Sequence, residues 1–146
     1  MKELAQTIEN EVDATAVRLH GLPESFVGSR PASGKWSPKE VLGHLVDSAH
    51  NNIRRLVCGQ YQNRPHIVYH QDEWVAVQHY QLYQWPDLIV LWLSLNRHFA
   101  HILAHLPEAD AERLCDTGKS GSDLHSLRWL AEDYLEHLRH HVKQIL

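Results

Sequence analysis

Apolar residues that recur every three or four positions are the feature that most constrains how this 146-residue chain can fold. The first such stripe occupies residues 3–20 and stops at Gly21 and Pro23, which favour the end of a helix. Residues at this spacing lie on one face of an α-helix, so the stripe predicts a helix with one buried side. Its members are Leu4, Ile8, Val12, Ala16 and Leu19.

A second helix is predicted from Ser37 to about Cys58. Ser37 can cap the helix, Pro38 occupies the first helical position, and Glu40 follows the cap by three residues. This arrangement satisfies the exposed N–H groups of a first turn and is typical of a helix start. The helix has a wide apolar face, and beside it runs a polar stripe made by His44, Asp47, Ser48, Asn51 and Arg55.

Two further helices are predicted in the second half of the chain. The third begins near Pro86 and ends before Pro107, and the fourth follows the loop 118–122 and continues nearly to the end. The fourth stripe is made by Leu124, Leu127, Ala131, Tyr134, Leu138, Val142 and Ile145. No segment alternates apolar and polar residues as a half-buried strand does. We therefore expect an all-α fold, a four-helix bundle forming one domain over residues 1–146.

The segment 59–84 is long enough to be a crossover between the second and third helices. Within it, Asp72 is a candidate cap for a short extra helix that reaches Tyr80, and residues 65–69 can be briefly extended.

Charge and composition exclude several classes of partner. The formal net charge is −4, and apart from Arg54 and Arg55 there is no cluster of basic residues that would bind nucleic acid. No apolar run approaches the roughly 20 residues that cross a bilayer, and the first residues lack the apolar stretch of a signal peptide. We expect a cytoplasmic protein in which Cys58 and Cys115 stay reduced.

Histidine is abundant, with 13 copies, and two of them have the spacing of metal ligands. His137 and His141 lie four residues apart, which places both imidazoles on one face of the fourth helix, whereas His140 points outward. Two imidazoles are half of a metal site. If the second helix packs against the fourth, His44 can supply a third ligand and leave one coordination position open.

Other uses of these histidines remain open. His98, His101 and His105 on the third helix form a rival set, although Phe99 and Ile102 hold the inward positions there. A coincidental pair, or histidines that serve only structure, would produce the same spacing. The polar stripe of the second helix would equally suit an ordinary solvated face.

Motifs spread along nearly the whole chain match the pattern of one known family. They are the stretch 35–48, Asn51, Arg55, Asp72, Trp74, Tyr80, Leu91, Trp92, Asn96, His137, His140, His141, Gln144 and Ile145. With these residues, the sequence resembles the DinB/YfiT-like superfamily of metal-dependent enzymes. That resemblance implies a four-helix bundle in which His44, His137 and His141 hold a divalent ion, often zinc or nickel.

The same resemblance implies thiol-dependent chemistry on a small molecule, namely transfer of a low-molecular-weight thiol to an electrophile or a thiol-assisted isomerisation. Asn51 and Arg55 are then candidates to hold a polar end of the substrate. Asp47 and Asp133 are candidate acceptors that orient the ligand imidazoles, since Asp133 lies four residues before His137. The alternative is a non-catalytic, stress-related module that binds a metal or another ligand. The apolar faces of the first and third helices suit a homodimer.

Overall fold

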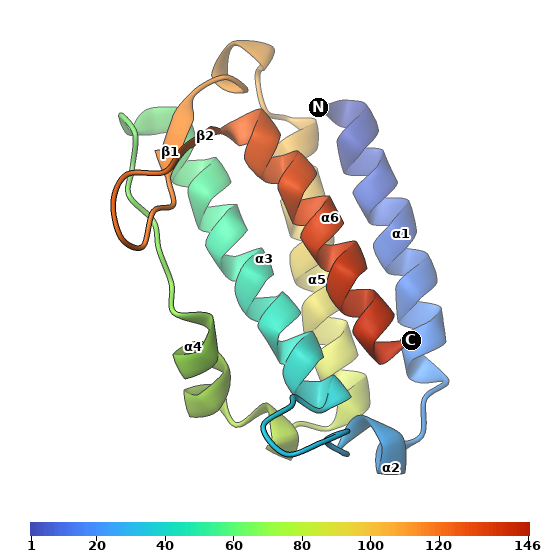
Figure 1. The fold of residues 1–146 in the computed structure, drawn as a ribbon. Helices are drawn as coiled ribbons and strands as arrows, with labels where there is room; N and C mark the ends of the chain where they lie inside the picture. Colours follow the sequence, from blue (N-terminus) through green and yellow to red (C-terminus); the bar gives the residue numbers. More distant parts are fainter.

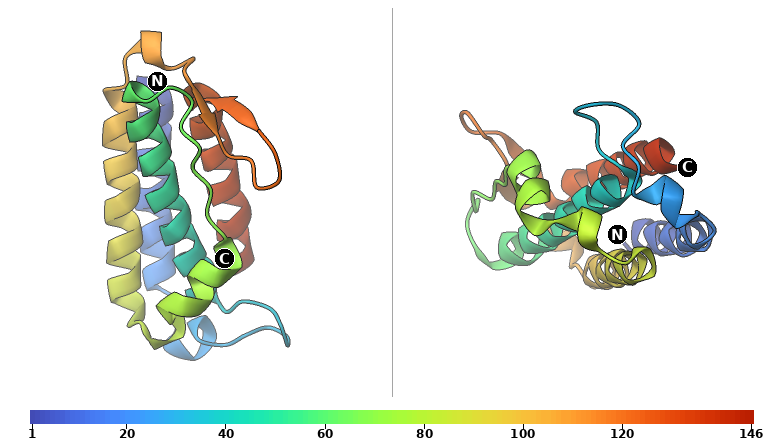
Figure 2. Two further views of the ribbon diagram at one scale, coloured as in Figure 1. Left: turned by 90° about the vertical axis from the view of Figure 1, so that its left-hand side faces the viewer. Right: turned by 90° about the horizontal axis from the view of Figure 1, so that it is seen from below.

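Four long helices form the body of the molecule in the computed structural model, which describes residues 1–146. Seen end-on, α3 and α6 lie together on one side of the bundle and α1 and α5 lie on the other (Figure 2). This arrangement confirms the predicted four-helix bundle (Figure 1). The long helices are α1 (Lys2–His20), α3 (Pro38–Tyr61), α5 (Trp85–Ala104) and α6 (Leu127–Ile145). None of the helices is long and apolar enough to cross a membrane.

Six short elements connect these helices. They are α2 (Glu24–Val27), α4 (Gln71–Gln78), the 3-10 turns η1 (Tyr80–Leu82) and η2 (Glu108–Asp110), and the strands β1 (Leu114–Asp116) and β2 (Leu124–Ser126). The two strands pair antiparallel, with Cys115 opposite His125.

The start of α3 follows directly from its sequence. Ser37 Oγ accepts a hydrogen bond from the Glu40 N–H at 3.2 Å, and Glu40 Oε2 accepts one from the Ser37 N–H at 2.8 Å. Pro38 occupies the first helical position, where its missing N–H costs nothing. The predicted capping box is therefore confirmed, and α3 ends at Tyr61, slightly beyond the predicted end near Cys58.

The predicted stripes build the core. Ile8, Val12 and Leu19 of α1 are completely buried, and they pack in one cluster with Trp92 and Phe99 of α5. Burial of such side chains is the main favourable contribution to folding. The core also holds a polar pair, because Tyr134 Oη donates a 2.6 Å hydrogen bond to Asn96 Oδ1.

The predicted start of the fourth helix, directly after loop 118–122, is wrong. Residues Leu124–Ser126 form β2, and α6 begins only at Leu127. Ser126 caps the helix, since its Oγ accepts a hydrogen bond from the Trp129 N–H at 3.1 Å. Leu124 continues the apolar spacing of the helix, but its backbone pairs instead with Asp116 of β1.

The crossover lies against one side of α3 and carries α4. The predicted extended piece at residues 65–69 is confirmed by one parallel bridge, in which the Ile67 N–H donates to the Asp116 carbonyl at 2.9 Å. The predicted cap is wrong, because His70 precedes the helix and Asp72 lies within its first turn. The helix also ends at Gln78, before Tyr80, since His79 adopts a left-handed conformation.

Tyr80 fixes the end of the crossover to α3. Its ring lies directly on Gly43, where an added Cβ would collide with three ring atoms. Its hydroxyl donates a 2.6 Å hydrogen bond to Asp47 Oδ1, which also accepts one from Gln78 Nε2 at 2.7 Å. A glycine and a buried carboxylate, one turn apart, therefore set the position of the segment that follows α4.

Candidate metal centre

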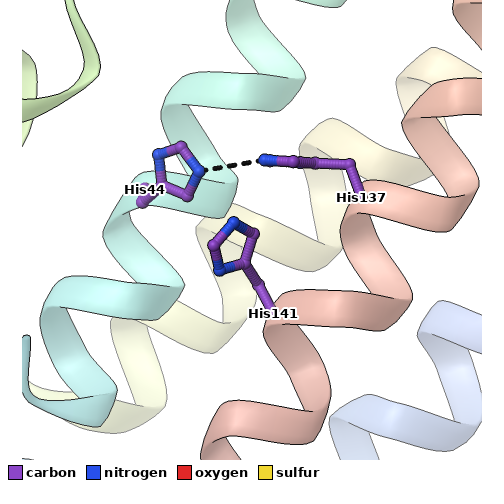
Figure 3. A group of neighbouring side chains, drawn as sticks. All are labelled: His44, His137 and His141. Atoms are coloured by element: carbon purple, nitrogen blue, oxygen red, sulfur yellow. Dashed lines mark hydrogen bonds between the residues drawn. The ribbon is translucent and has the colours of Figure 1, made fainter.

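Three histidines from two helices meet between α3 and α6. His44 projects from α3, His137 and His141 project from α6, and their rings turn toward a common point (Figure 3). The Nε2 atoms of His44 and His137 are 3.1 Å apart, and all three rings offer a ligand nitrogen within 4.8 Å of the others. Two nitrogens bound to one tetrahedral ion at about 2.1 Å lie about 3.4 Å apart, so small ring rotations suffice for all three to share a cation.

The electrostatics of the three rings suit a cation as well. Burial lowers the pKa of His44 to about 3 and that of His137 to about 4, and repulsion from the neighbouring protonated rings acts in the same direction. Burial also lowers the pKa of His141. All three imidazoles are therefore neutral near pH 7, and neutral imidazole is the form that coordinates a metal.

Two side chains set which nitrogen of each α6 histidine faces the centre. Gln144 Oε1 lies 2.9 Å from His141 Nδ1, and because an amide oxygen only accepts, His141 donates from Nδ1 and keeps a lone pair on Nε2. Ser48 Oγ lies 3.4 Å from His137 Nδ1 in an equivalent position. Partners of this kind fix the tautomer and orientation of metal-binding histidines.

His44 has no such partner. Its Nδ1 is buried without a hydrogen bond, its Nε2 faces the α6 pair, and its ring lies 5.2 Å from the Trp36 ring between centroids. Without a cation, the two facing Nε2 atoms of His44 and His137 must share one proton or repel each other. A cation between them removes this conflict, so the residues present fit a divalent ion.

The structure does not bring the two predicted acidic acceptors onto the ligand rings. Asp47 is buried and accepts from Tyr80 and Gln78, and burial raises the pKa of its carboxyl. Asp133 is exposed on α6, and its carboxylate makes no hydrogen bond. Ser48 and Gln144 contact the ligand imidazoles in place of these two carboxylates. Both residues lie three or four positions from a ligand histidine in the sequence, but many polar residues share that spacing, so it does not identify them.

The two candidate substrate-holding residues also have other partners. Asn51 Nδ2 donates to the Asp47 carbonyl at 2.9 Å. Arg55 donates to the Ile67 carbonyl through Nε at 3.3 Å and Nη2 at 3.1 Å. Arg55 thus holds the crossover against α3, and neither side chain lines the cavity described next.

A cavity of about 670 Å³ opens beside the histidines at the end of the bundle where α6 terminates. His141 and Gln144 line it from α6, and Trp36, which contacts His44, lines it from the loop before α3. This volume lies in the range of pockets that hold small molecules, roughly 300–1,000 Å³. The centre is therefore accessible to a small ligand from one side.

The rival histidines lie elsewhere. His98 and His101 are exposed on α5, and His105 is exposed directly after its end. His105 Nδ1 lies 2.8 Å from the His101 carbonyl oxygen and donates to it. His140 is also exposed, as its predicted direction requires. Only His44, His137 and His141 form a group of potential ligands that could surround one ion.

Comparison with known proteins agrees with this architecture. The sequence model of the DinB superfamily matches residues 7–145. The chain belongs to the DinB superfamily. The DinB chain is 28% identical over 149 residues to a "Putative metal-dependent hydrolase" of Geobacillus thermodenitrificans, covering 100% of this chain and 82% of that protein. A protein of the same description from Oceanobacillus iheyensis is 32% identical over 116 residues, covering 77% of this chain and 64% of the relative.

The fold has a close counterpart among solved structures. YfiT from Bacillus subtilis, described as "a probable metal-dependent hydrolase with an unusual four-helix bundle topology", superposes with a TM-score of 0.87. The match covers 98% of this chain and 82% of YfiT at 21% sequence identity. At this identity the likeness shows that the two proteins share a fold.

Proposed function

We propose that this DinB protein is a metal-dependent enzyme in which His44, His137 and His141 hold one divalent cation, with zinc or nickel as the best candidates. The convergence of three neutral imidazoles beside an accessible cavity is the observation that carries the proposal. The names of the Geobacillus and Oceanobacillus relatives support it. The cavity implies a small-molecule substrate.

The ligand set suits the activation of a nucleophile. When bound, a divalent cation with three neutral ligands would hold a thiol or a water molecule in its deprotonated form near neutral pH. Ser48 and Gln144 keep the imidazoles of His137 and His141 oriented. Trp36 covers His44 and keeps solvent from that side of the ring.

Within this class, we propose transfer of a low-molecular-weight thiol to an electrophilic substrate. The protein offers no thiol of its own at the centre, because neither Cys58 nor Cys115 lines the cavity. Cys115 is buried, and its Sγ lies 3.2 Å from the Pro65 carbonyl. In a thiol transfer, the thiol therefore has to come from a cosubstrate. Hydrolysis is the second candidate, and the names of the relatives favour it.

Turnover assays with metal-loaded protein prepared without a polyhistidine tag separate these functions. We expect conjugation of a chlorobimane or a chlorodinitrobenzene that requires both metal and an added thiol, and that is lost in His137→Ala. Cleavage of activated esters without any thiol would refute the transferase and indicate a hydrolase. Bound metal without turnover under either condition would indicate a non-catalytic binding module.

Two further properties stay predictions. Location in the cytoplasm is the first. A homodimer is the second, and light scattering of the purified protein at several concentrations tests it: a mass of about twice 16.9 kDa supports the dimer, and 16.9 kDa refutes it.

A further inference from the structure

The loop between α2 and α3 carries one cation that no protein group neutralises. Arg30 is paired with Glu40 at 2.6 Å, and Lys39 is paired with Glu24 at 3.2 Å. Lys35 lies between them in the sequence and makes neither an ion pair nor a hydrogen bond through its side chain. It lines the cavity beside His141, so its ammonium group is available to a ligand there.

The crossover contributes a carboxylate to the same cavity. Asp72 lies in the first turn of α4 and lines the cavity together with its neighbour Gln71. Its carboxylate has no hydrogen bond or ion pair in the protein, and it is the only carboxylate in the lining. The cavity therefore presents one free cation and one free anion that do not pair with each other.

The rest of the lining connects these charges to the metal centre. The loop before α3, the crossover helix α4 and the last turns of α6 gather at the same end of the bundle (Figure 1). His141 closes one wall of the cavity and Trp36 provides an apolar surface next to His44. A ligand held at this place can reach the histidine centre with a third group.

We propose that the cavity binds a small zwitterionic ligand, with its carboxylate on Lys35 and its ammonium group on Asp72, and directs a third, metal-seeking group toward His141. The proposal rests on the proposed function and deepens it, because it assigns the cosubstrate to amino-acid-like thiols. Opposite charges placed apart recognise a ligand that carries both and disfavour one that carries either alone. The position of Asp72 depends on the anchoring of the crossover by Tyr80.

Three thiols that differ in their charged groups test the proposal. Cysteine carries a carboxylate and an ammonium group, 3-mercaptopropionate carries only the carboxylate, and cysteamine carries only the ammonium group. Each thiol is titrated into cobalt-loaded protein. The thiolate-to-cobalt charge-transfer absorption band reports binding without any turnover. Because the three thiols differ in intrinsic acidity, the informative quantity is the change in each dissociation constant on substitution.

The two cavity substitutions should weaken the binding of different thiols. Lys35→Gln weakens the binding of cysteine and 3-mercaptopropionate but not that of cysteamine. Asp72→Asn weakens the binding of cysteine and cysteamine but not that of 3-mercaptopropionate. Each loss should be roughly twofold to fivefold, as for an ion pair between solvent-exposed groups. Lys143→Gln and Glu73→Gln remove the same charges from exposed positions outside the cavity and should leave all three constants unchanged.

The outcomes separate the two proposals. If thiols bind but both cavity variants affect all three equally, or affect none, the recognition by Lys35 and Asp72 is refuted and the thiol chemistry stands. If fully loaded cobalt protein shows no thiolate absorption with any of the three, the thiol-dependent function is refuted and this inference falls with it.

Discussion

Replacing Gly43 with alanine should destabilise the protein through Tyr80, although the same change stabilises most helices. Gly43 lies within α3, and an added Cβ would fall no more than 2.5 Å from three atoms of the Tyr80 ring. Tyr80 is 2% exposed and its hydroxyl is held by Asp47 at 2.6 Å. The ring cannot move aside without losing this hydrogen bond, so the crossover must shift.

The magnitude follows from opposing contributions. Alanine improves the helix propensity of an interior position by about 1 kcal/mol. Overpacking a filled site costs about 1–3 kcal/mol, and loss of a hydrogen bond to a charged group costs about 1.5–3 kcal/mol. Added together, these contributions should lower the free energy of unfolding by about 1.5–5 kcal/mol, or the melting temperature by roughly 5–15 °C for a chain of this size.

Urea denaturation of a double-mutant cycle measures this directly. In a Tyr80→Ala background the obstructing ring is absent, so Gly43→Ala should be neutral or stabilising by up to about 1 kcal/mol. Metal-free protein is used throughout, which keeps cation binding out of the measured stability. The reasoning is refuted if Gly43→Ala stabilises the wild-type protein, or if it destabilises both backgrounds by the same amount.

Three further predictions concern the site and its supports. Gln144→Leu removes the acceptor of the His141 Nδ1–H and should weaken metal binding roughly tenfold to a hundredfold in a chelator competition, whereas an unchanged affinity would contradict its orienting role. In metal-free protein the pKa of His44 is lowered to about 3 from 6.5, so the unfolded chain takes up a proton first and stability falls as the pH drops from 6.5 toward 3. The free energy of unfolding, measured by denaturation at several pH values, should therefore depend less steeply on pH in His44→Asn than in the wild type, by up to about 1.4 kcal/mol per pH unit. Equal slopes in the two proteins would argue against a buried neutral ring. Ser37→Ala removes the cap that accepts from the Glu40 N–H and should cost about 0.5–2 kcal/mol in thermal unfolding, with no loss expected only if the first turn of α3 is held by packing alone.

Local sequence signals were enough to predict the bundle. The start of α3 depends on Ser37, Pro38 and Glu40, which are close neighbours and need no tertiary partner to act. The direction of the histidines follows from helical geometry, because residues four apart share a face. Helical geometry alone therefore separates His141, which faces the centre (Figure 3), from His140, which faces solvent.

The short strands could not be predicted in this way. β1 and β2 have three residues each and pair with each other across residues 117–123, and β1 is also bridged to His66, which lies much earlier in the chain. The Asp116 N–H donates to the Pro65 carbonyl, and the Leu127 N–H donates to the Arg113 carbonyl. Such pairing overrides the helical spacing of Leu124, because local periodicity carries no information about distant backbone groups.

The surroundings of the site were likewise beyond the sequence. Acidic residues were the natural candidates to orient the imidazoles, but Asp47 is occupied by the crossover and Asp133 faces solvent. The orienting contacts come from Ser48 and Gln144, whose reach depends on how α3 and α6 pack. The cavity, too, exists only because three separate segments meet at one end of the bundle.

Metal stoichiometry of protein prepared without a polyhistidine tag tests the central claim most directly. After dialysis against zinc or nickel, elemental analysis should find about one equivalent per chain in the wild type and in His101→Ala, which alters the exposed pair with His105. His44→Ala, His137→Ala and His141→Ala should each lose most of the metal while staying helical by circular dichroism. Less than about half an equivalent in the supplemented wild type, or the same loss in His101→Ala as in the three ligand variants, would contradict the assignment.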